Sequence, residues 1–189
     1  MERDPVTLFS IGHSNRSIEG LIAILAQAGI KTLVDVRAQP RSARHPQFNE
    51  DVLRAACERA GIAYHWAGRQ LGGMRAPRPD SPHVALGEEV RGFADHMGTE
   101  PFKKAAAQLL QMAARAPTAM LCAERDPQHC HRALIADYLL LQGARVLHLI
   151  DTGDLREHLL SAQARRESAE LVYDRQSTGS FDFGSVTGN

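Results

Sequence analysis

Residues 7–36, TLFSIGHSNRSIEGLIAILAQAGIKTLVDV, hold the pattern that decides the fold. The apolar run 7–11 ends at Gly12, and 32–36 is a second run of the same kind, so both predict buried strands. Between them, apolar residues recur at helical spacing from Ser17, a helix-capping residue type, to Gly29, a helix-ending one. A strand, a helix and a strand in this order predict parallel strands with a right-handed crossover.

The same alternation continues along the chain. Further strands are expected at 62–66, 118–122 and 145–150, and further helices at 50–60, 88–96, 99–113 and 132–141. We therefore expect an α/β protein. Its architecture should be a single-domain three-layer sandwich with a mostly parallel central sheet of about five strands and helices on both faces.

The expected domain organisation has three parts. Residues 1–151 form the α/β domain, 152–175 form a C-terminal helical extension, and 176–189 form a flexible tail rich in Ser, Gly and Thr. Within the extension, leucines at helical spacing predict one amphipathic helix from 155 to about 169.

The composition narrows the class of protein. The 189 residues carry 22 Lys+Arg and 22 Asp+Glu, and this balance argues against a basic protein that coats DNA. Three cysteines do not make a disulfide framework. The N-terminus carries both charge signs, and no apolar run reaches the roughly 20 residues that span a bilayer. We expect a cytoplasmic protein without a membrane partner.

Polar and charged residues, whose side chains are costly to bury, follow three of the predicted strands. The three clusters are His13, Ser14, Asn15 and Arg16; Asp35, Arg37, Arg41 and Ser42; and Cys122, Glu124, Cys130, His131 and Arg132. Because the carboxyl ends of parallel strands meet at one edge of a sheet, we expect the clusters to converge on one crevice there.

The third cluster predicts an activated thiol. Cys130 precedes a helix, whose N-terminus favours a thiolate, and the adjacent His131 and a nearby Arg would lower the thiol pKa further. Cys122 ends a strand and should face the same crevice. The expected enzyme is a cysteine-dependent hydrolase or transferase, with His131, His129 or His13 as base and Glu124 as a general acid or base. The alternative is that both cysteines only pack and that Glu124 only pairs with an Arg.

The arginines predict an anion site. Arg16, Arg37 and Arg132 lie beside strand ends or a helix N-terminus, where guanidinium groups suit a phosphate or a carboxylate. The expected ligand is an anionic, phosphate-like or nucleotide-like small molecule. The remaining residues of the predicted substrate-binding set are Ser14, Asn15, Asp35, Arg41 and Ser42. The alternative is a buried ion pair of Asp35 with an Arg that only holds the strand ends.

Two further functions stay open. No cofactor is predicted, but Cys122, Cys130, His131 and His13 have the ligand types of a zinc or iron site, although their spacing is not that of a Cys-x-x-Cys pair. A nucleic-acid-binding module could use Trp66 together with Arg75 and Arg78 of the long loop.

The ordered motifs resemble those of the domain of unknown function 488 family, from about residue 7 to residue 150. The motifs are Ile11-Gly-His-Ser-Asn-Arg16, Val34-Asp-Val-Arg37 with Pro40-Arg-Ser42, Phe48-Asn49, Leu71-Gly-Gly73, Gly92-Phe-Ala-Asp95, and Leu121-Cys-Ala-Glu124 with Cys130-His-Arg132. The resemblance implies a small α/β protein of bacteria or archaea without an assigned activity, and some relatives carry a DNA-repair label. Its motif residues coincide with the predicted site residues.

Overall fold

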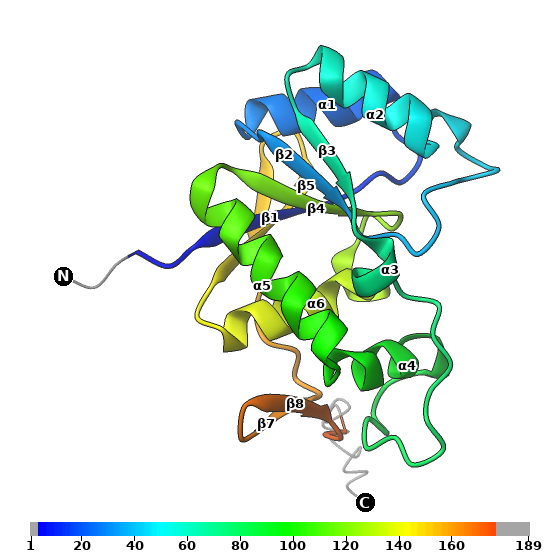
Figure 1. Cartoon of the computed structure of the whole chain (residues 1–189), viewed down its shortest axis with the longest axis vertical. Helices are drawn as coiled ribbons and strands as arrows, with labels where there is room; N and C mark the ends of the chain where they lie inside the picture. Colours follow the sequence, from blue (N-terminus) through cyan, green and yellow to red (C-terminus); the bar gives the residue numbers. More distant parts are fainter. Residues whose placement is uncertain (1–3, 177–189) are drawn as a thin grey trace, which may run out of the picture.

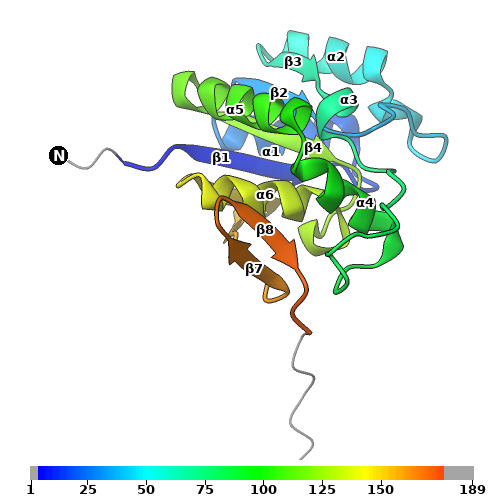
Figure 2. The ribbon, with the colours of Figure 1, turned by 60° about the horizontal axis from the view of Figure 1, so that its bottom comes forward.

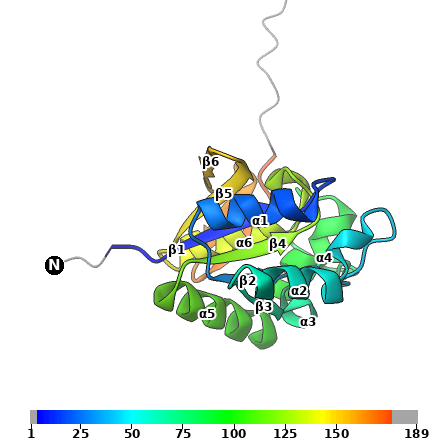
Figure 3. The same ribbon diagram turned by 90° about the horizontal axis from the view of Figure 1, so that it is seen from above.

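A six-stranded sheet forms the centre of the computed structural model, which describes residues 4–176. The strands are β1 (Thr7–Gly12), β2 (Thr32–Asp35), β3 (Ala63–Trp66), β4 (Thr118–Cys122), β5 (Arg145–Asp151) and β6 (Asp154–Glu157). They lie in the order β3-β2-β4-β1-β5-β6, and Figure 3 shows them from β6 at one edge to β3 at the other. β1 to β5 are parallel, whereas β6 runs antiparallel on β5. The predicted mostly parallel sheet is confirmed.

Helices cover both faces of this sheet, as the three-layer prediction requires (Figure 1). On one face lie α1 (Ile18–Gln27) and α2 (Glu50–Arg59), whose Leu21 and Leu53 pack with Leu33 of β2. On the other face lie α5 (Glu100–Arg115) and α6 (Arg132–Leu141), whose Phe102 and Ile135 pack with Met120 of β4. The loop before α5 contains the short α3 (Gly68–Leu71) and α4 (Glu88–Met97). Because both faces are covered, every residue of β4 is buried.

Local sequence signals place the first crossover. The Ser17 hydroxyl accepts a hydrogen bond from the Gly20 N–H at 3.0 Å, so α1 begins where the capping residue predicts. Gly29, at a φ of +69°, ends the turn after α1, in a conformation that glycine adopts without strain. The chain then enters β2.

The strand order creates a switch point between two neighbouring strands. The chain leaves β1 through α1 and passes β4 to reach β2, and it leaves β4 through α6 and passes β1 to reach β5. The two crossovers therefore depart in opposite directions from adjacent strands. In open α/β sheets the crevice at such a point, outside the carboxyl ends of the strands, is where ligands bind.

The predicted C-terminal helix is wrong. Residues 155–169 contribute instead to β6 and to a hairpin of β7 (Ala164–Glu167) and β8 (Glu170–Tyr173). After β5 the chain reverses at Thr152 and Gly153, the latter at a φ of +75°, so that β6 covers the edge of β5 with ladder hydrogen bonds. The hairpin buries Leu171 and Tyr173 beside α6 (Figure 2). Edge pairing and tertiary burial thus override the helical spacing of the leucines.

The predicted flexible tail, 176–189, lies outside the described residues except for its first position. Among residues 4–176, none of the helices has the length and apolar character needed to cross a membrane.

Candidate functional site

The carboxyl ends of β1, β2 and β4 open into one cavity of about 630 Å³. It lies at the switch point of the sheet. The predicted site residues that line it are His13, Ser14, Asn15, Arg37, Arg41, Ser42, Cys122, Glu124, Cys130 and His131. Polar clusters from three distant segments therefore share one hollow, which is the geometry that a parallel sheet imposes on residues after its strands.

Two sulfurs and one imidazole meet at the inner wall of this cavity. Nδ1 of His131 lies 3.9 Å from Sγ of Cys122 and 3.8 Å from Sγ of Cys130. The other ring nitrogen, Nε2, lies 3.1 Å from the Val36 carbonyl oxygen and 3.0 Å from that of Leu71. Because carbonyl oxygens only accept, the ring proton of neutral His131 belongs on Nε2. The lone pair on Nδ1 then faces the two thiols.

A hydrogen bond between the two thiols shifts their pKa values in opposite directions. A hydrogen bond from the Cys130 thiol, together with the charge of Arg132, holds the pKa of Cys122 below its ordinary value. The same contact and burial raise the pKa of Cys130. Of the two thiols, Cys122 is therefore the one that loses its proton more readily. Cys57, on α2, is buried alone, and its burial raises the pKa of its thiol to about 11.

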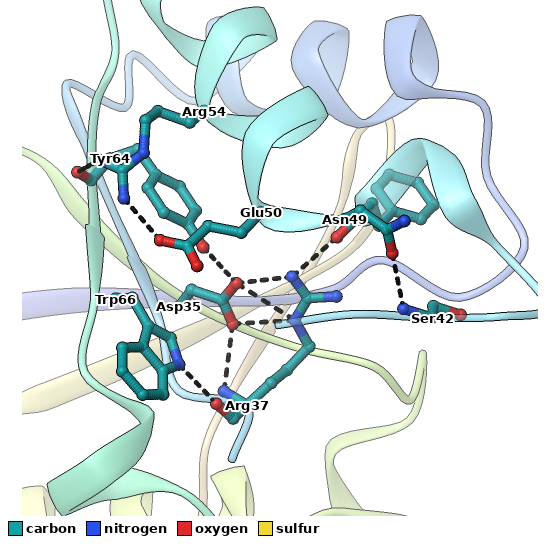
Figure 4. A network of polar contacts seen from close by, with 9 residues as sticks. Asp35, Arg37, Ser42, Asn49, Glu50, Arg54, Tyr64 and Trp66 are labelled. Carbon is teal, nitrogen blue, oxygen red and sulfur yellow. Dashed lines mark hydrogen bonds and ion pairs between the residues drawn. The ribbon is translucent and has the colours of Figure 1, made fainter. Parts of the chain in front are cut away.

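Arg37, which follows β2, also lines the cavity. Arg37 donates from Nε and Nη2 to both carboxylate oxygens of Asp35 at 2.6 to 3.2 Å, and from Nη2 to the Phe48 carbonyl at 2.9 Å (Figure 4). Tyr64 donates to the same carboxylate at 2.6 Å. Nη1 of Arg37 is buried and has no hydrogen-bond partner among residues 4–176. One arm of a firmly held guanidinium thus has no partner in the described part of the chain, and that nitrogen is itself buried.

His13 reaches the cavity from the end of β1 as a neutral ring. Burial, and then the charge of Arg37, lowers its pKa to about 4. Its Nδ1 lies 2.9 Å from the Ser14 carbonyl oxygen, so Nδ1 carries the proton and Nε2 a lone pair. The ring stacks on Phe48 with centroids 4.5 Å apart. His13 therefore offers a fixed hydrogen-bond acceptor or base to a molecule in the cavity.

Three predicted site residues do not line the cavity. Arg132 is 1% exposed and donates to the carbonyls of Glu124 at 2.9 Å and Arg125 at 3.2 Å, so it holds the loop after β4. Arg16 donates to the carbonyls of Gly12 and Ile150. Asp35 is fully buried beneath the cavity and orients its arginine partner, which is the structural alternative for that pair.

Sequence reasoning missed several residues that line the cavity. They are Gln39, Arg44, His45, Gly73, Met74 and Glu89. Arg44 and His45 follow the Arg41–Ser42 motif directly, and that proximity was the available signal. Gly73 and Glu89 come from the long loop and α4, and no local pattern links them to the strand ends.

A metal ion could be held by Cys122, Cys130 and His131. Their ligand atoms all lie within 4.8 Å of one another. His13, the fourth ligand type considered from the sequence, lies outside this group, and its Nδ1 is turned to Ser14. The sequence-based ligand set is thus reduced to two sulfurs and one nitrogen.

The comparisons with known proteins yield a family but no function. A family model described as Domain of unknown function DUF488 matches residues 17–139, which is more than half of the chain. No curated protein and no solved structure matches the chain.

Proposed function

Because the chain belongs to the domain of unknown function 488 family, whose description assigns no activity, we propose its function from the site: a thiol-dependent enzyme that acts on a small anionic molecule. One observation carries the proposal. The Nδ1 lone pair of His131 faces the Cys122 thiol in the same cavity that Arg37, with its unpaired Nη1, lines. A base, a nucleophile and an anion-binding group are the parts that covalent catalysis requires.

The proposed reaction is a group transfer through sulfur. The Cys122 thiol gives its proton to Nδ1 of His131, and the sulfur forms a bond to the electrophilic atom of the substrate. The bond to the leaving group breaks with its electron pair, and the leaving group takes the proton from Nδ1. Water, in a hydrolase, or a second acceptor, in a transferase, then displaces the sulfur, and its proton returns to the thiol.

The anionic group of the substrate would bind Nη1 of Arg37. The Asp35 carboxylate holds this guanidinium in place, and the buried Nη1 would become accessible when the ligand displaces the side chains that cover it. Arg41 and Arg44 are exposed at the cavity and add positive charge, whereas Glu89 and Glu124 oppose it. This mixed charge favours a small anion with further hydrogen-bonding groups over a polyanion.

Two matched alkylating reagents test the proposal. Iodoacetate and iodoacetamide carry the same electrophilic carbon, but only iodoacetate is an anion. We expect Cys122 to react with iodoacetate faster than glutathione does, and to favour iodoacetate over iodoacetamide more strongly than glutathione does. Peptide mass spectrometry assigns the modified residue. Cys57 is the internal control, since its burial and raised pKa predict no reaction in the folded protein.

Variants separate the two parts of the site. His131→Asn should slow alkylation by both reagents, and an Asp35→Asn, Arg37→Gln double variant should remove only the preference for iodoacetate. The double variant avoids leaving one buried charge unpaired. If neither Cys122 nor Cys130 reacts faster than glutathione with either reagent, the protein is not a thiol enzyme.

The nucleic-acid alternative has less support from the described contacts. Arg75 donates to the carbonyls of Gly72 and Arg69, and Arg78 forms ion pairs with Asp80 and Asp95. The Arg75 guanidinium is therefore occupied within the chain, and the charge of Arg78 is partly neutralised by two carboxylates. Salt-dependent binding of an oligonucleotide at low ionic strength would reinstate this function. A cytoplasmic location is part of the proposal, because the paired thiols need a reducing compartment.

A further inference from the structure

Cys122, Cys130 and His131 surround one point at the inner wall of the site cavity. The three ligand atoms lie within 4.8 Å of one another, and the two nitrogen–sulfur distances are 3.9 Å and 3.8 Å. Ligands on a tetrahedral zinc ion, with bonds of about 2.0 to 2.3 Å, are separated by about 3.5 to 3.8 Å. The unliganded side chains therefore stand within a few tenths of an ångström of the nitrogen–sulfur spacing that a bound cation needs.

The imidazole is oriented as a metal ligand would be. Nε2 of His131 faces the carbonyl oxygens of Val36 and Leu71, so its proton is held away from the sulfurs. A histidine that binds a metal through one ring nitrogen typically donates from the other to a backbone carbonyl or a carboxylate. The outer contacts that fix the ring are thus already formed by two separate segments of the chain.

Charge and burial also suit a divalent cation. Cys122, Cys130 and His131 are 7%, 6% and 9% exposed, and two thiolates at this depth would leave uncompensated negative charge. One divalent cation with two thiolates and a neutral imidazole is a neutral unit. Because all three residues line the cavity, a fourth coordination position would open towards it.

We propose that Cys122, Cys130 and His131 form a binding site for a thiophilic divalent cation such as zinc, which reversibly blocks the thiol site. Two sulfurs and one imidazole nitrogen favour zinc over magnesium or calcium, which prefer oxygen ligands. A sulfur bound to the metal cannot attack a substrate. The blocking effect rests on the proposed function, whereas the cation site needs only the three ligand atoms.

Zinc binding to reduced, metal-free protein without a His tag tests the site. The protein competes for Zn²⁺ with a chromogenic chelator, and we expect one equivalent bound per chain. Cys130→Ser keeps the size of the side chain but removes a ligand, so its affinity should fall by more than about a hundredfold, beyond the loss usual for outer contacts. Cys57→Ser, on α2, should bind as the parent does. Cobalt should give thiolate-to-metal absorption in the parent protein and in Cys57→Ser, and this absorption should weaken in Cys130→Ser.

Alkylation with and without the metal separates the two proposals. Protection of Cys122 from iodoacetate by one equivalent of zinc supports the blocking effect. Fast alkylation without zinc uptake overturns the cation site and leaves the thiol enzyme intact. Zinc uptake with slow alkylation of the metal-free protein overturns the thiol enzyme and leaves the cation site intact. Zinc affinity that is the same in Cys130→Ser as in the parent also overturns the site, provided that circular dichroism shows a folded variant.

Discussion

Asp35 and Arg37, two residues apart at the end of β2, form a buried two-pronged ion pair whose arginine lines the site cavity and keeps one buried nitrogen unpaired. The side chains of Asp35 and Arg37 are 0% and 5% exposed. A pair this deep does little for stability by itself, because desolvation offsets the attraction. The pair instead fixes the position of the guanidinium beside the site cavity.

Removing the charge of Asp35 alone should be severe. Asp35→Asn leaves the Arg37 guanidinium buried without its counter-ion, and we expect a loss of about 3–5 kcal/mol in the free energy of unfolding. Urea denaturation followed by circular dichroism measures it. The matched control is Tyr64→Phe, which removes only one hydrogen bond to the same carboxylate and should cost about 1–2 kcal/mol. Equal losses in the two variants would contradict the ion-pair interpretation.

Gly12 is required where β1 meets the loop after β4. A Cβ at this position would lie 1.7 Å from the Glu124 carbonyl oxygen, so Gly12→Ala must displace the backbone that follows Cys122. We expect a loss of about 3 kcal/mol in unfolding free energy and slower alkylation of Cys122. Gly98→Ala is the control, because its Cβ would meet nothing closer than 3.6 Å. A Gly12→Ala protein as stable as the control would show that the loop yields freely.

Arg132 should hold the loop after β4 rather than bind a ligand. Arg132→Met leaves the carbonyl oxygens of Glu124 and Arg125 without their donor, and we expect about 3 kcal/mol of destabilisation. Amide hydrogen exchange of residues 123–131 should also accelerate. Arg125→Met, which loses only an exposed ion pair with Asp151, should change stability by less than about 1 kcal/mol. Unchanged exchange in Arg132→Met would refute the structural role.

Acid should destabilise the fold through buried neutral histidines. Burial lowers the pKa of His13 to about 4 and that of His148 to about 3, from 6.5 when unfolded. Between its folded pKa and 6.5, each of these histidines binds a proton in the unfolded chain but not in the folded one. Stability is therefore complete above pH 6.5 and falls as the pH drops towards 4, by about 1.4 kcal/mol per group and pH unit.

Urea midpoints across this pH range measure the effect. Nδ1 of His148 lies within hydrogen-bond distance, 2.9 Å, of the Ser10 hydroxyl, and its Nε2 lies 2.9 Å from Nδ1 of His158, so His148→Gln should be less stable at every pH. Its stability should nevertheless depend less steeply on pH, because one of the two protons is no longer taken up. Stability of the parent protein that does not change between pH 6.5 and 5 would exclude the buried-histidine mechanism.

Apolar runs and capping residues sufficed to predict the strands of the main sheet and its first helix, because these signals act between residues close in sequence. The strand at 118–122 is wholly apolar or small, and the structure begins and ends β4 there. The helix at Ser17 starts where a side-chain oxygen meets an N–H three residues away. Neither feature needs information from a distant segment. The clusters at the strand ends followed from the same alternation, because parallel strands bring their carboxyl ends to one edge.

The C-terminal extension shows where such rules fail. Leu155 and Leu159 have helical spacing but are 50% and 80% exposed, and they belong to β6 and the segment after it. β6 pairs with the otherwise unpaired edge of β5, and the buried side chains of Leu171 and Tyr173 pack in the same core as α6. β5 directly precedes β6 through the turn at Thr152 and Gly153, a hairpin that helical periodicity does not detect. In contrast, α6 is distant from β8 in the sequence, so no local pattern could identify that contact.

The order of residues alone determined that sulfur, imidazole and guanidinium groups follow the strands of a parallel sheet, because strand and helix signals act over a few residues. Only the folded chain decided which of these groups face the cavity. Arg37 remains there, whereas Arg16 and Arg132 turn to backbone carbonyls. The proton of His131 is likewise placed by Val36 and Leu71, which are distant in the chain. Side-chain direction depends on hydrogen-bond partners from other segments, and those become neighbours only when the layers pack.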